Sequence, residues 1–360
     1  MQVFDRVNGD AHEQVVFCHD RGAGLRAIVA IHSTRLGPSL GGTRFYPYPD
    51  EDAALEDVLR LSKGMTYKSA AAGLDLGGGK AVILGDPATD KTEALLRAYA
   101  RFIDGLGGRY VTAEDVGTTQ ADRDLIRRET RHVTGVSRSL GGSGDPSEAT
   151  AYGVLHAMRA VARQLWGSTE LKGKHITITG VGKVGYALCR HLVEERVRLT
   201  VADVNPASVE RARHDFNAEA VDADRSHAVA CDLWSPCALG GALNSSTIPE
   251  LQCEAVVGSA NNQLADASGP KAMQDAGVLY APDYIVNAGG VINIAEELRG
   301  YHRERAYGQV RRIYDTTTAV LETAAAEGIT TAEAADRLAE RRIEQLSHVR
   351  LLRTSRGDDR

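Results

Sequence analysis

The hydrophobic pattern of the chain predicts alternating strands and helices. Valine- and isoleucine-rich runs at residues 14–19 and 25–32 are typical of strands, and the Asp-Arg-Gly-Ala-Gly segment between them predicts a hairpin turn. After Asp50, apolar residues recur at helical spacing, which predicts an amphipathic helix. Strands that alternate with helices predict an α/β fold. We expect further strands at 81–84, 109–113, 175–179, 198–202, 232–237 and 254–259, and helices at 93–106, 122–129, 150–166, 186–195, 303–327 and 330–346.

The most specific local signal lies in the second half of the chain. The strand at 175–179 runs into a glycine-rich loop, a helix follows, and the next strand ends at Asp203. This context is typical of a Rossmann dinucleotide-binding fold, and a plain glycine turn without a ligand is the alternative. Asp203 would accept hydrogen bonds from ribose hydroxyls and repel a 2′-phosphate, so we prefer NAD to NADP. The loop residues expected at the pyrophosphate are Gly180, Val181, Gly182, Lys183, Val184 and Gly185.

Two later strands of the same predicted sheet carry small or amide residues beyond their ends. Ala238 and Leu239 follow one of them, and Asn261 follows the other. Ligands gather beyond the carboxyl ends of strands in open α/β sheets, so these residues are candidate cofactor contacts. Cys237 lies in the same stretch, where a small buried hydrophobe is a more natural role for it than a nucleophile.

Two lysines in the first half of the chain carry the candidate chemistry. Lys80 ends a Gly-Gly-Gly-Lys run, and Lys68 stands twelve residues before it. The glycines allow close approach to backbone and ligand because they lack Cβ atoms. Two ammonium groups brought together suit a substrate carboxylate, and their repulsion and partial burial would lower the pKa of one of them. For this segment alone, however, a glycine turn beside two solvated lysines is the preferred interpretation.

Other candidate groups lie near predicted strand ends. Asp115 follows a strand, which is a suitable place for chemistry. It could instead cap the next helix, although Thr118 and Thr119 are nearer and better placed for that role. Gly41 and Gly42 could present backbone N–H groups to an anion or could belong to a plain loop.

Composition and charge mainly exclude some classes of function. The 360 residues are 43% hydrophobic and 25% charged, which is ordinary for a soluble protein of two domains. The net charge of -6 argues against nucleic-acid binding, and no apolar run reaches membrane-spanning length. Five cysteines without a Cys-x-x-Cys pair favour free thiols over disulfides or a metal site. We expect a cytoplasmic protein without a secretory signal, with a hinge near the glycine- and serine-rich residues 135–145.

Together these segments resemble the amino acid dehydrogenases of the glutamate/leucine/phenylalanine/valine family, most closely its branched-chain members. The resemblance runs from about residue 14 to residue 346. It implies a two-domain α/β fold, a homo-oligomer, and reversible NAD-dependent deamination of an L-amino acid to a 2-oxo acid, ammonia and NADH. It also implies a substrate and oligomerisation domain at 1–137, a Rossmann NAD domain at 138–330, and a C-terminal part at 331–360 that returns to the first domain, with the active site in the cleft between the domains. The segments that carry the resemblance are 31–38, 41–44, 64–68, 77–80, 112–118, 236–241, 260–263 and 280–291.

The resemblance implies roles for individual residues. Lys68 would pair with the substrate carboxylate, and Asp115 would handle the substrate amine. Lys80 would be the base that activates water, and the Lys68 charge and a dry cleft would lower its pKa so that it is partly neutral. Thr150 would lie near the nicotinamide amide. Carboxylate binding would be completed by Gly41, Gly42 and Asn262.

The side-chain pocket implied by the resemblance is apolar, and it consists of Leu40, Ala113, Val291 and Ile294. None of the four invites a second carboxylate, so leucine, valine and isoleucine fit better than glutamate. One methylene is worth only ~1–3 kcal/mol in such a pocket, so these three substrates will overlap.

Three alternatives remain beside branched-chain deamination. The same chemistry on phenylalanine or tryptophan is one, and a catalytically silent NAD- or amino-acid-binding regulator on this fold is another. A 2-hydroxy-acid dehydrogenase is the third, but it usually needs a histidine base with an arginine, and neither stands out at the cleft positions. Two positions depart from the family pattern: Lys183 replaces a common asparagine in the glycine loop, and Trp234-Ser235 replaces a smaller aromatic and an alanine.

Overall fold

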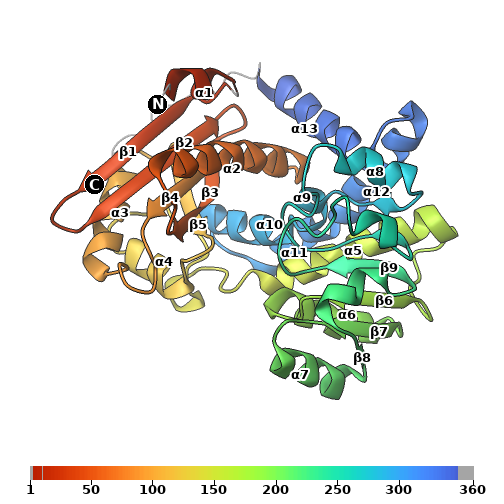
Figure 1. The fold of residues 1–360 in the computed structure, drawn as a ribbon. Helices are drawn as coiled ribbons and strands as arrows, with labels where there is room; N and C mark the ends of the chain where they lie inside the picture. Colours follow the sequence, from red (N-terminus) through yellow and green to blue (C-terminus); the bar gives the residue numbers. More distant parts are fainter. Residues whose placement is uncertain (1–2, 10, 348–360) are drawn as a thin grey trace.

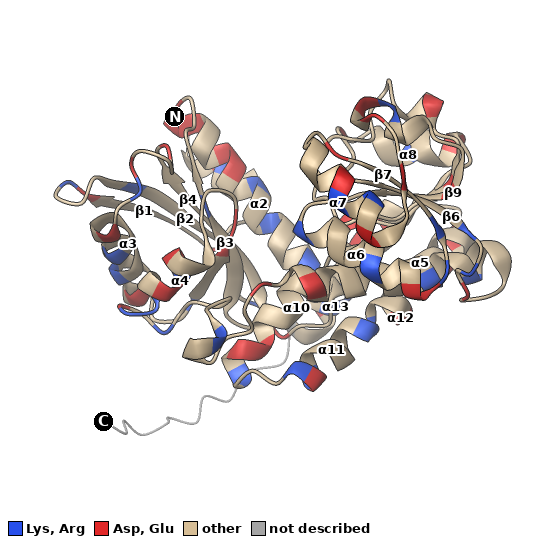
Figure 2. Ribbon diagram, turned by 90° about the horizontal axis from the view of Figure 1, so that it is seen from below, with Lys and Arg blue, Asp and Glu red and all other residues tan. Residues whose placement is uncertain are grey.

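A computed structural model describes residues 3–9 and 11–347. Two lobes, each built on its own β-sheet, lie side by side; α10 (Gly289–Ala295) lies between them, and α13 (Thr331–Ser347) lies at the top of the view (Figure 1). Lys, Arg, Asp and Glu are found mainly on helices and loops (Figure 2). No helix in the described ranges is long and apolar enough to cross a membrane.

The first lobe is a five-stranded mixed sheet with the order β1-β2-β4-β3-β5. β1 pairs antiparallel with β2, and β2 pairs antiparallel with β4, whereas β3 lies parallel to both β4 and β5. Leu55, Val58 and Leu59 of α2 pack on one face of the sheet, and Leu96 and Tyr99 of α3 pack on the other. The elements are α1 (Val3–Gly9), β1 (Gln14–Asp20), β2 (Leu25–Ser33), β3 (Ser39–Tyr46), α2 (Glu51–Ala71), β4 (Gly77–Leu84), α3 (Glu93–Gly105), β5 (Tyr110–Glu114) and α4 (Gln120–Ile126).

The second lobe is a six-stranded parallel sheet with the order β11-β10-β9-β6-β7-β8. Its first strand, β6, lies in the middle, and the chain adds strands first on one side and then on the other, as in a Rossmann fold. The topological switch point therefore lies between β6 and β9. The strands are β6 (His175–Thr179), β7 (Arg198–Ala202), β8 (Glu219–Ala220), β9 (Cys231–Pro236), β10 (Cys253–Val256) and β11 (Leu279–Tyr280), and the helices are α5 (Ser147–Trp166), α6 (Lys183–Glu194), α7 (Pro206–Phe216) and α8 (Gly269–Asp275).

The remaining helices connect the lobes. Ala334, Ala335 and Ala339 of α13 pack against Ala70 and Ala71 of α2, so the C-terminal helix contacts the first lobe. Residues 348–360 of the predicted C-terminal part lie outside the described residues. These helices are α9 (Asp283–Val286), α10 (Gly289–Ala295), α11 (Arg303–Arg311), α12 (Ile313–Glu327) and α13 (Thr331–Ser347).

Several local predictions differ from the structure. The loop alternative for Gly41 and Gly42 is wrong, because both lie within β3, and the glycine turn at residues 77–79 is the start of β4. Glycine has a low strand propensity, so its pattern does not reveal a strand. The helix predicted at 303–327 is two helices that meet at Arg312.

The glycines of β4 bring the sheet unusually close to α2. A Cβ atom on Gly78 would lie 2.0 Å from the backbone nitrogen of Thr66. Only glycine permits this contact, and Thr66 is two residues before Lys68 on the same helix. The close approach therefore sets the distance between the helix that carries Lys68 and the strand that carries Lys80.

We predict that Gly78→Ala destabilises the protein by ~3 kcal/mol or more, because the added methyl group meets backbone rather than a movable side chain. Thermal unfolding of the purified protein measures this. Gly64→Ala is the matched control, because Gly64 lies on α2 and a Cβ atom there would have no neighbour within 4 Å. At that position alanine favours the helix, and stability is unchanged or higher. Equal stability of the two variants would contradict the proposed constraint.

Candidate active site

A cavity of about 830 Å³ lies between the two lobes. It contains every residue that the sequence assigns to catalysis or substrate binding, although these come from distant parts of the chain. Strands of the first sheet, helix α2, the loop after β10 and helix α10 all contribute to its wall. The predicted residues in this wall are Leu40, Gly41, Gly42, Lys68, Lys80, Ala113, Asp115, Asn262, Val291 and Ile294.

Lys80 and Asp115 form an ion pair inside this cavity. The Lys80 side chain is only 5% exposed, and its Nζ donates to Oδ2 of Asp115. The other carboxylate oxygen, Oδ1, accepts from Nε of Arg44 at 3.0 Å. Burial acts to raise the pKa of Asp115, but the charges of Lys80 and Arg44 lower it to about 2. Asp115 is therefore a carboxylate at neutral pH.

Lys68 faces the same cavity from α2. Its Nζ donates to Oδ1 of Asn287 at 2.6 Å, and Nδ2 of Asn287 donates to Oδ1 of Asn261 at 2.8 Å. Burial lowers the pKa of Lys68 to about 8; Asp283 opposes this shift and the Lys80 charge adds to it. The sequence-based expectation placed the lowered pKa at Lys80, the base; the lysine whose pKa burial lowers is Lys68, which the resemblance assigns to the substrate carboxylate.

Sequence reasoning assigned no role to Arg44 or Asn287. Arg44 also donates to Oδ2 of Asp57 at 2.7 Å, so it links Asp115 to a second carboxylate on α2. Both residues stand in segments that carry the resemblance, shortly after or before a glycine pair. That proximity was the only signal, because contacts between α2 and residue 287 join positions far apart in the chain.

Gly41 and Gly42 are required for strand packing. A Cβ on Gly41 would lie 1.7 Å from the carbonyl oxygen of Gly79, and one on Gly42 would lie 2.2 Å from that of Glu114. Both glycines line the cavity, so anion binding by their backbone stays a prediction.

The glycine loop after β6 lies at the switch point of the second sheet. Gly180 has a φ of 94°, and a Cβ there would lie 2.7 Å from Ala238. A Cβ on Gly185 would lie 1.9 Å from the carbonyl oxygen of Gly180, so helix and strand pack closely there. A Cβ on Gly182, by contrast, would have no neighbour within 4 Å, which leaves this part of the loop accessible to a ligand. The residues therefore fit a dinucleotide whose phosphates lie at the N-terminus of α6.

The other predicted cofactor residues are distributed around this loop. Oδ2 of Asp203 accepts from the backbone nitrogen of Val181 at 2.8 Å, so this carboxylate also holds the loop. Leu239 is 84% exposed beyond β9. Thr150, Val184 and Asn261 line the cleft cavity itself.

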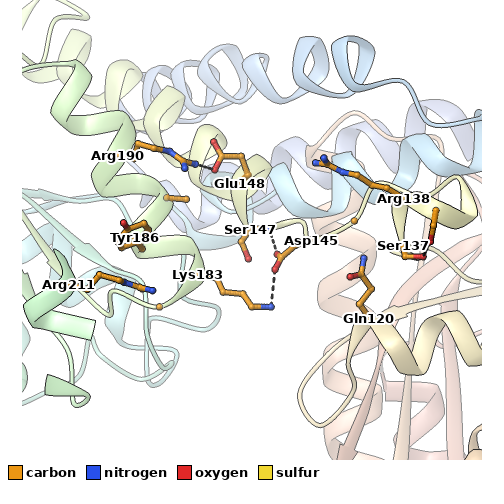
Figure 3. A pocket seen from close by; sticks show the side chains of 14 residues that line it. Gln120, Ser137, Arg138, Asp145, Ser147, Glu148, Lys183, Tyr186, Arg190 and Arg211 are labelled. Atoms are coloured by element: carbon orange, nitrogen blue, oxygen red, sulfur yellow. Dashed lines mark hydrogen bonds and ion pairs between the residues drawn. The ribbon is translucent and has the colours of Figure 1, made fainter. Parts of the chain in front are cut away.

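A second cavity, of about 910 Å³, lies on the other side of the glycine loop (Figure 3). Lys183 extends into it and forms an ion pair with Asp145 at 2.9 Å. Arg190 of α6 forms an ion pair with Glu148 of α5 on the same side (Figure 3). The Lys183 side chain therefore contacts the segment that joins the lobes and does not point into the turn of the glycine loop.

Fold and site together define a two-domain α/β oxidoreductase with a Rossmann-type domain. Two family models match the chain: the Glu/Leu/Phe/Val dehydrogenase dimerisation domain at residues 12–132, and Glutamate/Leucine/Phenylalanine/Valine dehydrogenase at 141–210 and 198–350. The chain belongs to this amino acid dehydrogenase family.

Individual relatives agree with this assignment. The chain is 52% identical to a leucine dehydrogenase of Bacillus cereus over 359 residues, which cover 100% of the chain and 98% of the relative. It is 52% identical to a valine dehydrogenase of Streptomyces virginiae, with 92% and 94% covered. A crystal structure of L-tryptophan dehydrogenase from Nostoc punctiforme matches with a TM-score of 0.85 and 45% identity, covering 96% of this chain and 99% of that one.

We predict that a substrate-like carboxylate without an amine, 4-methylpentanoate, binds more weakly as the pH rises through about 8. Below its pKa of about 8, Lys68 is positively charged and can pair with the carboxylate; above it the charge is lost. The dissociation constant should be flat below this pH and should rise about tenfold for each pH unit above it. Calorimetric titration at several pH values measures this.

Lys68→Met is the control variant for this titration. It should bind the carboxylate weakly at every pH and should show no bend near pH 8. A wild-type profile that is flat up to pH 10 would remove Lys68 from the carboxylate site.

Proposed function

We propose that this protein catalyses the reversible NAD-dependent oxidative deamination of branched-chain aliphatic L-amino acids to 2-oxo acids, ammonia and NADH. The observation that carries the proposal is the buried Lys80–Asp115 ion pair beside Lys68 in one cavity. Its family membership and its 52% identity to leucine and valine dehydrogenases support the same reaction.

Three side chains divide the chemical work. Lys68 holds the substrate carboxylate, which keeps the α-carbon in a fixed position. Asp115 is already ionised, so it accepts a hydrogen bond from the substrate amine and can take up one of its protons. Lys80, which contacts Asp115, acts after it has released its own proton to solvent: its neutral amine takes a proton from water as that water attacks the iminium carbon. When bound, NAD supplies the hydride acceptor.

The apolar end of the cavity supports branched aliphatic substrates. Leu40 is fully buried, Ala113 and Val291 are nearly so, and Ile294 is partly buried beside them. Such walls offer neither charge nor hydrogen bonds to the substrate side chain. They therefore select among apolar substrates by the size and shape of the side chain. The tryptophan dehydrogenase of Nostoc punctiforme, at 45% identity, supports aromatic substrates as the second candidate.

The cofactor, assembly and domain roles belong to the same proposal. Asp203 at the end of β7 favours NAD over NADP, because a carboxylate repels a 2′-phosphate. The match to a dimerisation-domain model supports a homo-oligomer. We assign substrate binding and subunit contacts to residues 1–137, the cofactor to 138–330 and the returning C-terminal part to 331–360. Five free cysteines agree with a cytoplasmic location.

The direct test is NADH formation from L-leucine, L-valine, L-isoleucine, L-phenylalanine, L-tryptophan and a 2-hydroxy acid, with NAD and with NADP. We expect kcat/KM to be highest for the three branched-chain substrates with NAD. Turnover only with aromatic amino acids would move the assignment to the second candidate, and the absence of turnover with all of them would leave a binding protein.

We predict that Lys80→Ala lowers kcat with L-leucine by at least about a thousandfold while NADH still binds within about twofold of the wild type. The fold should survive, because Asp115 keeps its bond to Arg44. Steady-state kinetics and NADH fluorescence titration measure the two effects. Lys91→Ala is the control, because Lys91 is paired with Asp122 outside the cavity. Equal loss of turnover and NADH binding would make Lys80 a structural residue.

A further inference from the structure

A buried arginine on the cofactor side of the cleft has no role in the function proposed above. Arg123 lies on α4, is 1% exposed and is the largest of the fully buried side chains. Its Nε donates to the carbonyl oxygen of Gly135 at 2.6 Å, and its Nη1 forms an ion pair with Glu114. Its Nη2 is also buried, and it has no hydrogen-bond partner anywhere in residues 3–9 and 11–347. Buried donors are nearly always satisfied, so this one indicates a missing acceptor.

The guanidinium lies in the wall of the active-site cavity. Pro146, Thr150 and Val184 line the same cavity from the second lobe and from the segment that joins the lobes. Gln120 stands one turn before Arg123 on α4, and it points into the gap between the lobes on the side of Lys183 and Asp145 (Figure 3). Residues three apart share a helix face, so this face of α4 is directed at the glycine loop.

Arg123 is close enough to the glycine loop for its charge to act on Lys183. The pKa of Lys183 is raised, mainly by its hydrogen bond to Asp145; Glu114 also acts to raise it, and Arg123 acts to lower it. Two cations therefore lie at the glycine loop: Lys183 belongs to it, and Arg123 comes from the first lobe. Each is paired with one carboxylate. An incoming ligand must be a strong acceptor to gain from such partly neutralised donors.

A phosphate group meets this requirement. Its oxygens are charged, and they match the geometry of guanidinium N–H groups better than neutral amides or hydroxyls do. The 12-residue helix α6 and the open face of Gly182 make the phosphates of a dinucleotide the natural anion at this wall.

We propose that Arg123 binds the pyrophosphate of the dinucleotide, donating from Nη2 across the cleft from the glycine loop. This inference rests on the proposed function, because it assumes a dinucleotide at the loop. Arg123 would be a cofactor-binding residue contributed by the first lobe, whereas the other predicted phosphate contacts belong to the second. Glu114 would weaken the interaction by neutralising part of the charge.

Calorimetric titration with three ligands tests the proposal without turnover. NADH and ADP-ribose contain the pyrophosphate, whereas adenosine contains no phosphate. We expect Arg123→Met to weaken NADH and ADP-ribose about tenfold, the usual effect of losing one charge-assisted hydrogen bond, and to leave adenosine within about twofold. Arg127→Met is the matched control: Arg127 lies one turn later at the end of the same helix, is exposed, and should show wild-type binding of all three.

Three results would overturn the proposal. Unchanged binding of ADP-ribose would remove Arg123 from the phosphate site, and loss for NADH alone would place it at the nicotinamide. Equal loss for adenosine would mean that the variant disturbs the whole site through its bond to Gly135. If wild-type protein binds neither NADH nor ADP-ribose, the proposed cofactor fails as well; if it binds both and the Arg123 variant is unchanged, only this inference fails.

A second variant keeps the proposal testable if Arg123→Met does not fold. Glu114→Gln retains the size of the side chain and an acceptor for Arg123 but removes the negative charge. We expect it to tighten ADP-ribose binding by several-fold, because the guanidinium charge is no longer neutralised. A purely structural Arg123–Glu114 pair predicts unchanged or weaker binding, and that outcome would refute a role in phosphate binding.

Discussion

The buried ion pair of Lys80 with Asp115 is the interaction on which the rest of the site depends. A charge taken out of water needs a partner, and removing one member of a buried pair typically costs ~3–5 kcal/mol. Here the carboxylate has two cations, because Arg44 holds its second oxygen. This arrangement keeps Asp115 ionised and fixes both side chains before a substrate enters. Lys68, whose Nζ donates to a neutral amide, retains a lowered pKa, and its Nζ has no carboxylate partner in the described residues that would compete with the substrate carboxylate proposed for it.

Backbone geometry brings these charges together. The parallel strands β3, β4 and β5 bring Gly41, Lys80 and Ala113 to nearly the same level of the first sheet, and α2 lies close against β4 because Gly78 has no side chain. The distance from Lys68 to Lys80 thus follows from contacts between backbones, which adjust less than contacts between side chains. A site built this way is preorganised, and preorganisation is what proximity and electrostatic catalysis require.

Polar contacts join the two lobes at the cofactor side of the cleft. Glu297 accepts from the backbone nitrogens of Gly135 and Ser143, and Lys183 pairs with Asp145. Arg123 holds the carbonyl oxygen of Gly135 from the first lobe. Charged groups of both lobes therefore contact the segment between the lobes that contains Gly135, Ser143 and Asp145. Through this segment the glycine loop interacts electrostatically with the first lobe.

The sequence by itself determined the α/β class and the Rossmann motif with Asp203, because each depends on local pattern or short spacing. Lys68, Lys80 and Asp115 followed only from the resemblance to a family, and the structure brings the three to one cavity. The sequence pattern missed strand β3 and the start of β4, since glycines give no strand signal. Only the tertiary structure decided which lysine has the lowered pKa, that Arg44 and Asn287 hold the reactive groups, and that Arg123 is buried with an unsatisfied donor within the described part of the chain. The burial and pairing of charged groups depend on which distant segments of the chain pack together, and local sequence patterns do not show this.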